Sequence, residues 1–272
     1  MRHIDDVWLI VLILLAVMTM AFLLLPITVS VTMSFDSRSY LGQFPPPGLS
    51  LRWYKKFFAD PYFLNGLKMS MILASIAACV STAIGVTAAL VLDRYDFPGK
   101  DALAALFLSP LIVPAVVIGF ALLMFFALLG VFEGFPRLVG GHVLITIPYT
   151  VRTTLASLVG IRRSLSEAAL SLGANEREAF WEITFPLAKT GIVAGAVLAF
   201  AFSMDDVAVS MFLTDPHAYT LPVAMISAMR SDFDMTISAA AVLLVLITLV
   251  LLLLLDRVVG LDKLIGQGVY RA

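Results

Sequence analysis

The chain has 272 residues, of which 61% are hydrophobic and 14% charged, and its formal net charge is −1 at pH 7. Soluble domains usually contain about 45–50% apolar and about 25% charged residues, so this composition excludes an ordinary soluble protein. The near-zero net charge excludes nucleic acid as an expected partner. A single cysteine, Cys79, excludes an intrachain disulfide and any multi-cysteine metal site, and no metal is expected.

A helix needs about 20 predominantly apolar residues to cross the hydrocarbon core of a bilayer, and several runs reach this length. The sequence therefore predicts an all-α integral membrane protein in which residues 1–272 form a single domain. The six predicted transmembrane helices lie at about residues 7–34, 67–92, 102–129, 142–161, 191–213 and 235–255.

The first run is too long for a secretory signal, whose apolar region typically has about 7–15 residues, so we expect a retained span. The polar segment 35–64 follows. In its second half Trp53 lies among aromatic and basic residues, which favours a short helix at the membrane–water interface. A contact between Trp53 and a transported ligand is the alternative.

Pro110 and Pro114 lie in the first half of the third span. Because proline removes a backbone hydrogen bond, they predict a bent or broken helix near residues 108–116, the one clear break expected inside a span. Residues 130–141 and 214–234 are expected to be connections, and residues 256–272 a polar tail.

Lys and Arg residues are more frequent in cytoplasmic connections than in external ones. A cytoplasmic N-terminus places ten of them inside and seven outside, and three of the ten lie close to the ends of spans four and five. The sequence therefore predicts that both termini are cytoplasmic.

The polar stretch 161–190 separates the fourth and fifth spans. Ser-x-x-Glu at Ser164 and Asn-x-x-Glu at Asn175 have the spacing of a capping box, so each predicts a helix start. Gly173 is expected to end the first helix in a left-handed conformation, and Pro186 to end the second. The first helix has one face of apolar and small residues, which fits a docking surface for a partner and a self-contained loop equally well. The residues of this face are Leu165, Ala168, Ala169 and Leu172.

The same stretch resembles the EAA loop of binding-protein-dependent ABC importer permeases, whose pattern is EAA-x3-G-x9-I-x-L-P. The matching residues here are Glu167, Ala168, Ala169, Gly173, Ile183 and Pro186. The one departure is Phe185 in place of leucine. In that family the loop docks on the ATPase subunit, so the resemblance implies that these residues couple the chain to an ATPase. The chain lacks a phosphate-binding G-x-x-x-x-G-K-[ST] motif, so ATP and Mg²⁺ are expected in the partner and no catalytic residue is expected here.

Residues 203–214, followed by Leu221 and Pro222, resemble the corresponding region of spermidine/putrescine-type permeases. This resemblance implies a permease subunit in a bacterial inner membrane that forms half of the pathway for a small cation, namely a polyamine. It also implies an external or periplasmic binding protein, an ATPase dimer and a sister permease as partners, with lipid around the spans. An amino acid or an aminophosphonate is the alternative cargo.

A carboxylate inside a span costs about 2.5–3.5 kcal/mol on insertion scales and is a functional candidate. Asp205 and Asp206 lie in the fifth span, about 100° apart on a helix. One could therefore line the substrate pathway while the other pairs with a helix or caps a break, and Trp53 is a further candidate for the pathway. The alternative is a structural role for the aspartates, paired with Arg152 or a backbone donor. Arg152 in the fourth span is expected to form a structural pair, and the lone residues His142 and His217 are expected to be interfacial.

Two other classes of protein compete with the importer. An ion-coupled secondary transporter would use Asp205 or Asp206 as its coupling group, but such folds usually contain paired broken helices. An intramembrane aspartic protease needs two carboxylates that converge on one water, and neighbouring residues on one helix do not supply this geometry.

Overall fold

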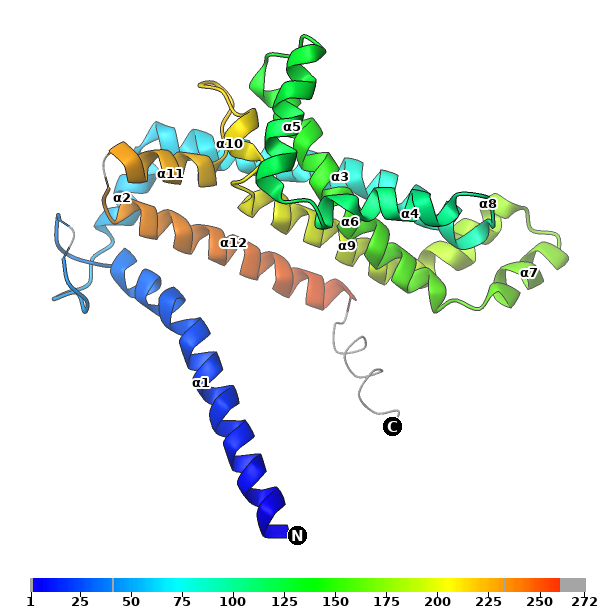
Figure 1. The fold of residues 1–272 in the computed structure, drawn as a ribbon, viewed down its shortest axis with the longest axis horizontal. Coiled ribbons are helices and arrows are strands. Elements are labelled where there is room, and N and C mark those ends of the chain that lie inside the picture. Colours follow the sequence, from blue (N-terminus) through cyan, green and yellow to red (C-terminus); the bar gives the residue numbers. More distant parts are fainter. Residues whose placement is uncertain (1, 41, 232, 260–272) are drawn as a thin grey trace. The chain divides into compact units, whose positions relative to one another are not determined.

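The structure of the chain is a computed structural model that describes residues 2–40, 42–231 and 233–259 (Figure 1). In chain order the helices are α1 (Arg2–Ser34), α2 (Arg52–Ala59), α3 (Pro61–Arg94), α4 (Lys100–Leu108), α5 (Ala115–Leu128), α6 (Gly134–Val159), α7 (Arg163–Ser171), α8 (Glu176–Ala179), α9 (Phe185–Asp205), α10 (Ser210–Leu213), α11 (Leu221–Ser231) and α12 (Thr236–Val259). A 3₁₀ turn, Ser109–Leu111, follows α4, and a π-helical turn, Phe180–Thr184, joins α8 to α9. The predicted helical class is confirmed for these residues, whereas most of the predicted polar tail lies outside them.

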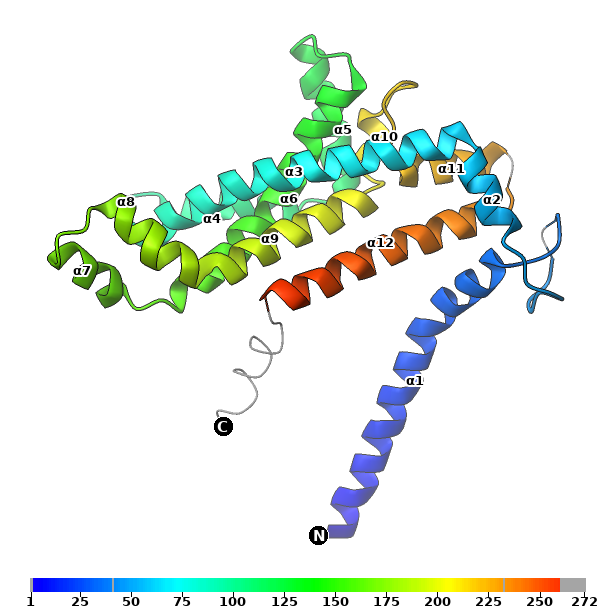
Figure 2. The same cartoon turned by 180° about the vertical axis from the view of Figure 1, so that it is seen from behind.

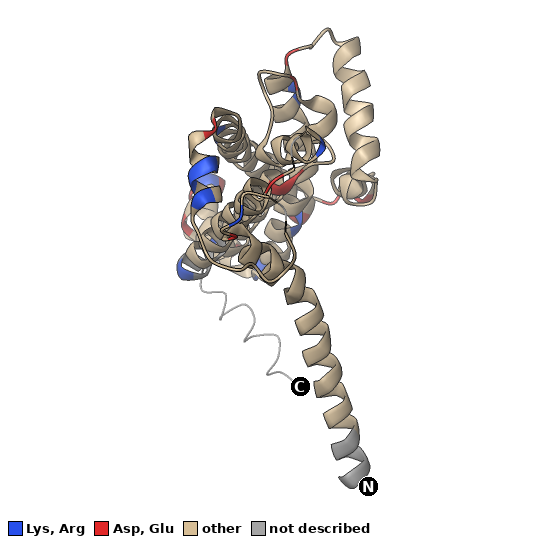
Figure 3. Cartoon of the chain, turned by 90° about the vertical axis from the view of Figure 1, so that its left-hand side faces the viewer, with Lys and Arg blue, Asp and Glu red and all other residues tan. Residues whose placement is uncertain are grey.

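Several of the described helices are long and apolar enough to cross a membrane. Trp8–Ser34, Pro61–Arg94 and the continuous stretch Glu176–Asp205 meet this criterion alone, and α4 with α5 and α6 with α7 meet it as bent pairs. Figure 3 shows long stretches of helix without Lys, Arg, Asp or Glu. These features support a multi-pass membrane protein, while the count of six spans stays a prediction.

The contacts between helices divide the chain into two compact units. The smaller unit contains the described residues up to Leu64 together with Met225–Val245. Its core forms where the end of α1, α2 and the start of α12 pack around an indole ring. The buried side chains of this core are Met33, Trp53, Met235 and Ala239.

The larger unit contains residues 65–224 and the described residues from 246 onwards. Within it α3, α6 and α9 lie side by side (Figures 1 and 2). Gly85 of α3 and Gly195 of α9 both face Thr150 of α6, and a Cβ on Gly195 would lie 3.0 Å from the Thr150 Cα. The Thr150 hydroxyl also donates to the Ser81 carbonyl at 2.8 Å. Small residues thus let three helices meet closely enough for hydrogen bonding between them.

The break predicted in the third span is confirmed. The axis turns by 104° between Lys100–Leu111 and Ala115–Leu128, and Pro114 precedes the first residue of α5. A second break lies at the aspartate pair, where one residue was expected either to pair with a helix or to cap a break: α9 ends at Asp205, Asp206 is extended with ψ 125°, and α10 begins at Ser210. The expectation of a single broken span is therefore wrong.

Two predicted connections contain more helix than expected. Helix α6 begins at Gly134, eight residues before the predicted start. Pro136 is compatible with this start, because it lies in the first turn, where backbone N–H groups have no helical partner. It does not interrupt the helix, because proline is tolerated in a first helical turn. Helix α11 occupies Leu221–Ser231 within the predicted polar connection.

Candidate functional site

The apolar face of helix α7 is exposed. The axis of α7 turns by 70° from that of α6, and none of its residues is buried. On the predicted apolar face Leu165 is exposed, and Leu172, at the C-terminal end of the helix, is 89% exposed. An amphipathic helix with an uncovered apolar face is a surface that a partner can bury.

Gly173 ends α7 as predicted, in a left-handed conformation with φ +98°. The Gly173 N–H donates to the Leu170 carbonyl at 3.1 Å, and the Ala174 N–H donates to the Ala169 carbonyl at 3.0 Å. These two bonds form a Schellman motif, which satisfies carbonyls that the end of a helix leaves without partners.

Of the two predicted capping boxes, one is present. The Asn175 side chain accepts from the Glu178 N–H at 2.9 Å, and the Glu178 carboxylate accepts from the Asn175 N–H at 2.9 Å. The box predicted at Ser164 is wrong, because α7 begins at Arg163, its N-cap residue is Arg162, and it has no side-chain cap. As a consequence the Glu167 carboxylate is not used by a cap.

Pro186 does not end the second helix, contrary to expectation. The chain continues from α8 through the π-helical turn into α9, and Pro186 lies in the first turn of α9. The Phe185 N–H donates to the Phe180 carbonyl, five residues back. This wider turn changes the hydrogen-bond register just before the proline, so the helical path persists.

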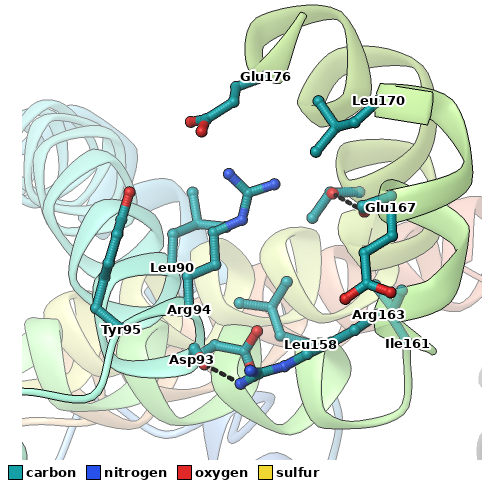
Figure 4. Close-up of a pocket in the computed structure, with 12 residues that line it drawn as sticks. Leu90, Asp93, Arg94, Tyr95, Leu158, Ile161, Arg163, Glu167, Leu170 and Glu176 are labelled. Atoms are coloured by element: carbon teal, nitrogen blue, oxygen red, sulfur yellow. Dashed lines mark hydrogen bonds between the residues drawn. The ribbon is translucent and has the colours of Figure 1, made fainter. Parts of the chain in front are cut away.

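A cavity of about 230 Å³ lies between this loop and the end of α3 (Figure 4). Arg163 of α7 donates to the Asp93 carbonyl at 2.5 Å, so it ties the loop to α3. The charged side chains of Arg94, Glu167 and Glu176 also line the cavity. The loop therefore rests on the end of a long helix that is itself part of the central packing.

The six residues that match the EAA pattern all keep exposed surface. They are Glu167, Ala168, Ala169, Gly173, Ile183 and Pro186. They lie along α7, its C-terminal turn, the π-helical turn and the start of α9. Their role in coupling stays a prediction.

The two neighbouring carboxylates have different environments. Asp206 accepts from the Ser210 N–H at 2.8 Å and from the Ser210 hydroxyl at 2.9 Å, so it caps the short helix α10. Asp205, the last residue of α9, is exposed. One of the two carboxylates thus caps a break, as one alternative expected, and a place for Asp205 on a solute pathway stays a prediction.

His142 is not interfacial, contrary to expectation. It is fully buried, and its ring contacts Ser203 of α9 through Nδ1 at 2.7 Å and Ser210 of α10 through Nε2 at 2.9 Å. Sequence reasoning missed this contact. The available signal was a polar residue every fourth position along α6, and these residues all proved to be buried. The four residues are His142, Thr146, Thr150 and Thr154.

The remaining candidates stay apart from this cluster. Arg152 is exposed beside an apolar cavity of about 460 Å³, and the structural pair expected for it is absent among the described residues. His217 is exposed. Trp53 is 3% exposed, and its indole N–H donates to the Asp36 carbonyl at 2.8 Å, which is the environment of an anchor. A solute contact by Trp53 stays a prediction.

The arrangement of helices is that of an ABC transporter permease. It is similar to the structure of a bacterial ABC transporter involved in the import of alginate, with a TM-score of 0.74, 15% identity and coverage of 95% of this chain and 97% of that chain. It is also similar to an amino acid ABC transporter, with a TM-score of 0.61, 18% identity and coverage of 76% and 97%. At these identities the likeness defines the fold alone.

Residues 81–261 match the family model described as the inner membrane component of binding-protein-dependent transport systems, and the chain belongs to this family. The spermidine/putrescine transport system permease protein PotC of Shigella flexneri is 32% identical over 91% of this chain and 93% of its own. The putrescine transport system permease protein PotI of Escherichia coli K12 is 32% identical over 87% and 85%. The chain is thus a transport subunit and not an enzyme. This excludes the alternative of an intramembrane aspartic protease.

Proposed function

We propose that this chain forms half of the translocation pathway of an ATP-driven importer for a polyamine of the spermidine or putrescine type. The observation that carries the proposal is the 32% identity to a spermidine/putrescine permease along nearly the whole length of both chains. The exposed Asp205 at the end of α9 supports it, because a carboxylate offers a counter-charge to an ammonium group.

In this proposal the chain crosses the membrane six times, with both termini in the cytoplasm, and residues 162–190 form the coupling loop. The apolar face of α7 supports this role because it is exposed, and the side chain of Leu172 at its end is 89% exposed. The face would dock on an ATPase dimer, and ATP with Mg²⁺ would bind there and not in this chain.

Two further partners follow from the proposal. A sister permease would supply the other half of the pathway, and an external binding protein would deliver the solute. A solved alginate transporter of the same fold was crystallised with its periplasmic protein bound to an alginate pentasaccharide, which supports this kind of assembly.

The proposal is tested by uptake in proteoliposomes that contain the chain, its sister permease and its ATPase, with the cognate binding protein outside. We expect ATP-dependent accumulation of labelled putrescine or spermidine, unaffected by an excess of unlabelled amino acids. ATP-dependent accumulation of an amino acid or an aminophosphonate without polyamine uptake would assign another cargo.

A further inference from the structure

A buried polar cluster joins the fourth span to both sides of the break in the fifth. His142 of α6 is 0% exposed, as is Ser210 of α10, and Ser203 of α9 is 1% exposed. Both ring nitrogens of His142 are engaged, one with a serine before the break and the other with a serine after it. The His142 ring therefore forms hydrogen bonds to both sides of this break.

The hydrogen bonds of Ser210 fix the direction of two protons, that of its own hydroxyl and that of the His142 Nε2–H. The Asp206 carboxylate accepts from the Val209 N–H at 3.4 Å and from the N–H and hydroxyl of Ser210 at 2.8 and 2.9 Å. Because the single Ser210 hydroxyl hydrogen points at Asp206, its oxygen must accept from the His142 Nε2–H. A neutral ring then leaves Nδ1 as an acceptor for the Ser203 hydroxyl.

The segment after the break is also held by packing. Val209 and Leu213 are both 0% exposed and belong to the same core cluster as Leu73 and Leu138. Both flanks of the break are therefore fixed, and Asp205 lies between Ser203 and Asp206. Its backbone has little freedom, although its side chain is exposed.

We propose that His142 is a positioning residue for the solute pathway: by bridging Ser203 and Ser210 it fixes the break at which Asp205 meets the solute. This inference rests on the proposed function in two respects: the solute is a polyamine, and Asp205 lies on its pathway. His142 itself touches no solute, because it is buried. Its effect passes through the placement of the Asp205 carboxylate.

Three substitutions separate the two bonds of the ring. H142F retains an aromatic ring and loses both bonds, H142N can retain the bond to Ser203, and H142Q can retain the bond to Ser210. The matched control is T146V, one turn along α6. Thr146 is equally buried, but its hydroxyl donates to the main-chain carbonyl of His142 at 2.6 Å, so this substitution leaves both bonds of the His142 ring in place. H142N and H142Q are tested in parallel because loss of both bonds can also hinder assembly.

The first readout does not depend on the cargo. In the assembled complex, Cys79 is replaced by serine and Asp205 by cysteine, and the rate of maleimide labelling at position 205 is measured. We expect the His142 variants to change this rate at least about fivefold and T146V to leave it within about twofold of the parent. An unchanged rate in all three His142 variants would overturn the proposal.

The second readout is polyamine uptake with native Cys79 and Asp205. We expect H142F and D205N each to lower maximal uptake about tenfold or more, with the apparent KM for the loaded binding protein unchanged, because a displaced contact group acts after delivery. The double variant should be no worse than either single one, since both act through one group. Multiplied losses of about a hundredfold would overturn the proposal, whereas a wild-type complex that carries no polyamine would overturn only the proposed cargo.

Discussion

Asp205 and Asp206 are consecutive in the chain, yet their carboxylates have different environments. Asp206 accepts backbone and hydroxyl hydrogen bonds at the start of α10, and these bonds compensate for the backbone partners lost at the break. Asp205 ends α9 with its carboxylate exposed. Among the described residues the Asp205 side chain has no hydrogen-bond or ion-pair partner, and a carboxylate in this state within a span is costly, which is why we propose that it meets the solute.

Substitution by asparagine should separate these tasks. D206N leaves at least one donor of α10 with a weaker acceptor, and hydrogen bonds to charged groups contribute about 1.5–3 kcal/mol. We expect a clear fall in the unfolding temperature of D206N in detergent, and none in D205N, which should instead lose uptake. Equal destabilisation by the two variants would contradict the assignment.

Gly173 is the residue on which the end of α7 depends. Its φ of +98° is strained for any residue with a Cβ, at a cost of about 1–2 kcal/mol. We expect G173A to weaken binding of the ATPase subunit several-fold, measured by co-purification. The matched control is G160A, because Gly160 has φ −77° and an added Cβ there meets nothing closer than 3.7 Å. Equal binding of both variants would show that the turn is not needed.

For single residues, the sequence predicted correctly the features that depend on residue type alone. Gly173 and the Asn175 cap were correct, because a left-handed turn and a reciprocal cap require those side chains. The Ser164 cap failed because spacing shows which bonds can form but not where the helix begins. The contacts of His142 were missed because its partners lie 61 and 68 residues away in the chain.

Helix α7 is an element whose exposed face has a predicted partner. A charge on this face should leave the fold intact, since none of its residues is buried, but should oppose burial against an ATPase. We expect L172E to lower ATPase co-purification at least tenfold. S171E carries the same charge beside this face and is the control. Normal binding of L172E would exclude this face as the docking surface.

The segment after α1 contains an ion pair that links stability to pH. The Arg38 guanidinium donates to the Asp36 carboxylate, with an Nη2–Oδ2 distance of 2.6 Å, and these bonds hold the pKa of Asp36 below its ordinary value of 3.8. A lowered folded-state pKa stabilises the fold above that ordinary value, and the contribution is lost as the pH falls below it.

Comparison of D36N with the wild type should reveal this contribution. We expect the difference in unfolding temperature to be steady near neutral pH and to shrink below about pH 4. The measurement is thermal unfolding in detergent at a series of pH values. A difference that grows in acid would contradict the ion pair.

The two broken spans mark the limit of sequence reasoning about elements. Pro110 and Pro114 predicted the first break, because proline has no backbone N–H to donate within a helix. Neither proline nor glycine lies at the second, between Asp205 and Ser210. At that break the Asp206 carboxylate accepts from the Val209 and Ser210 N–H groups, and His142 joins the side chains of Ser203 and Ser210. The His142 contacts depend on packing between helices, which the sequence does not show.

For the whole molecule, composition predicted a helical membrane protein, and the spacing of one loop pointed to its family. The cargo could not follow from that loop, because the role predicted for it is docking on an ATPase and not contact with the solute. The exposed Asp205 and the polyamine permeases among its relatives supply that part of the account.

The central claim is that this chain carries a polyamine only when the loop 162–190 transmits ATP hydrolysis in a partner. The most direct measurement compares putrescine uptake and ATP hydrolysis in one set of proteoliposomes, with and without the ATPase and with Glu167 and Gly173 replaced. The account predicts uptake only in the complete complex, and loss of uptake in the loop variants while the membrane subunits remain assembled. Uptake that persists without any ATPase would contradict it.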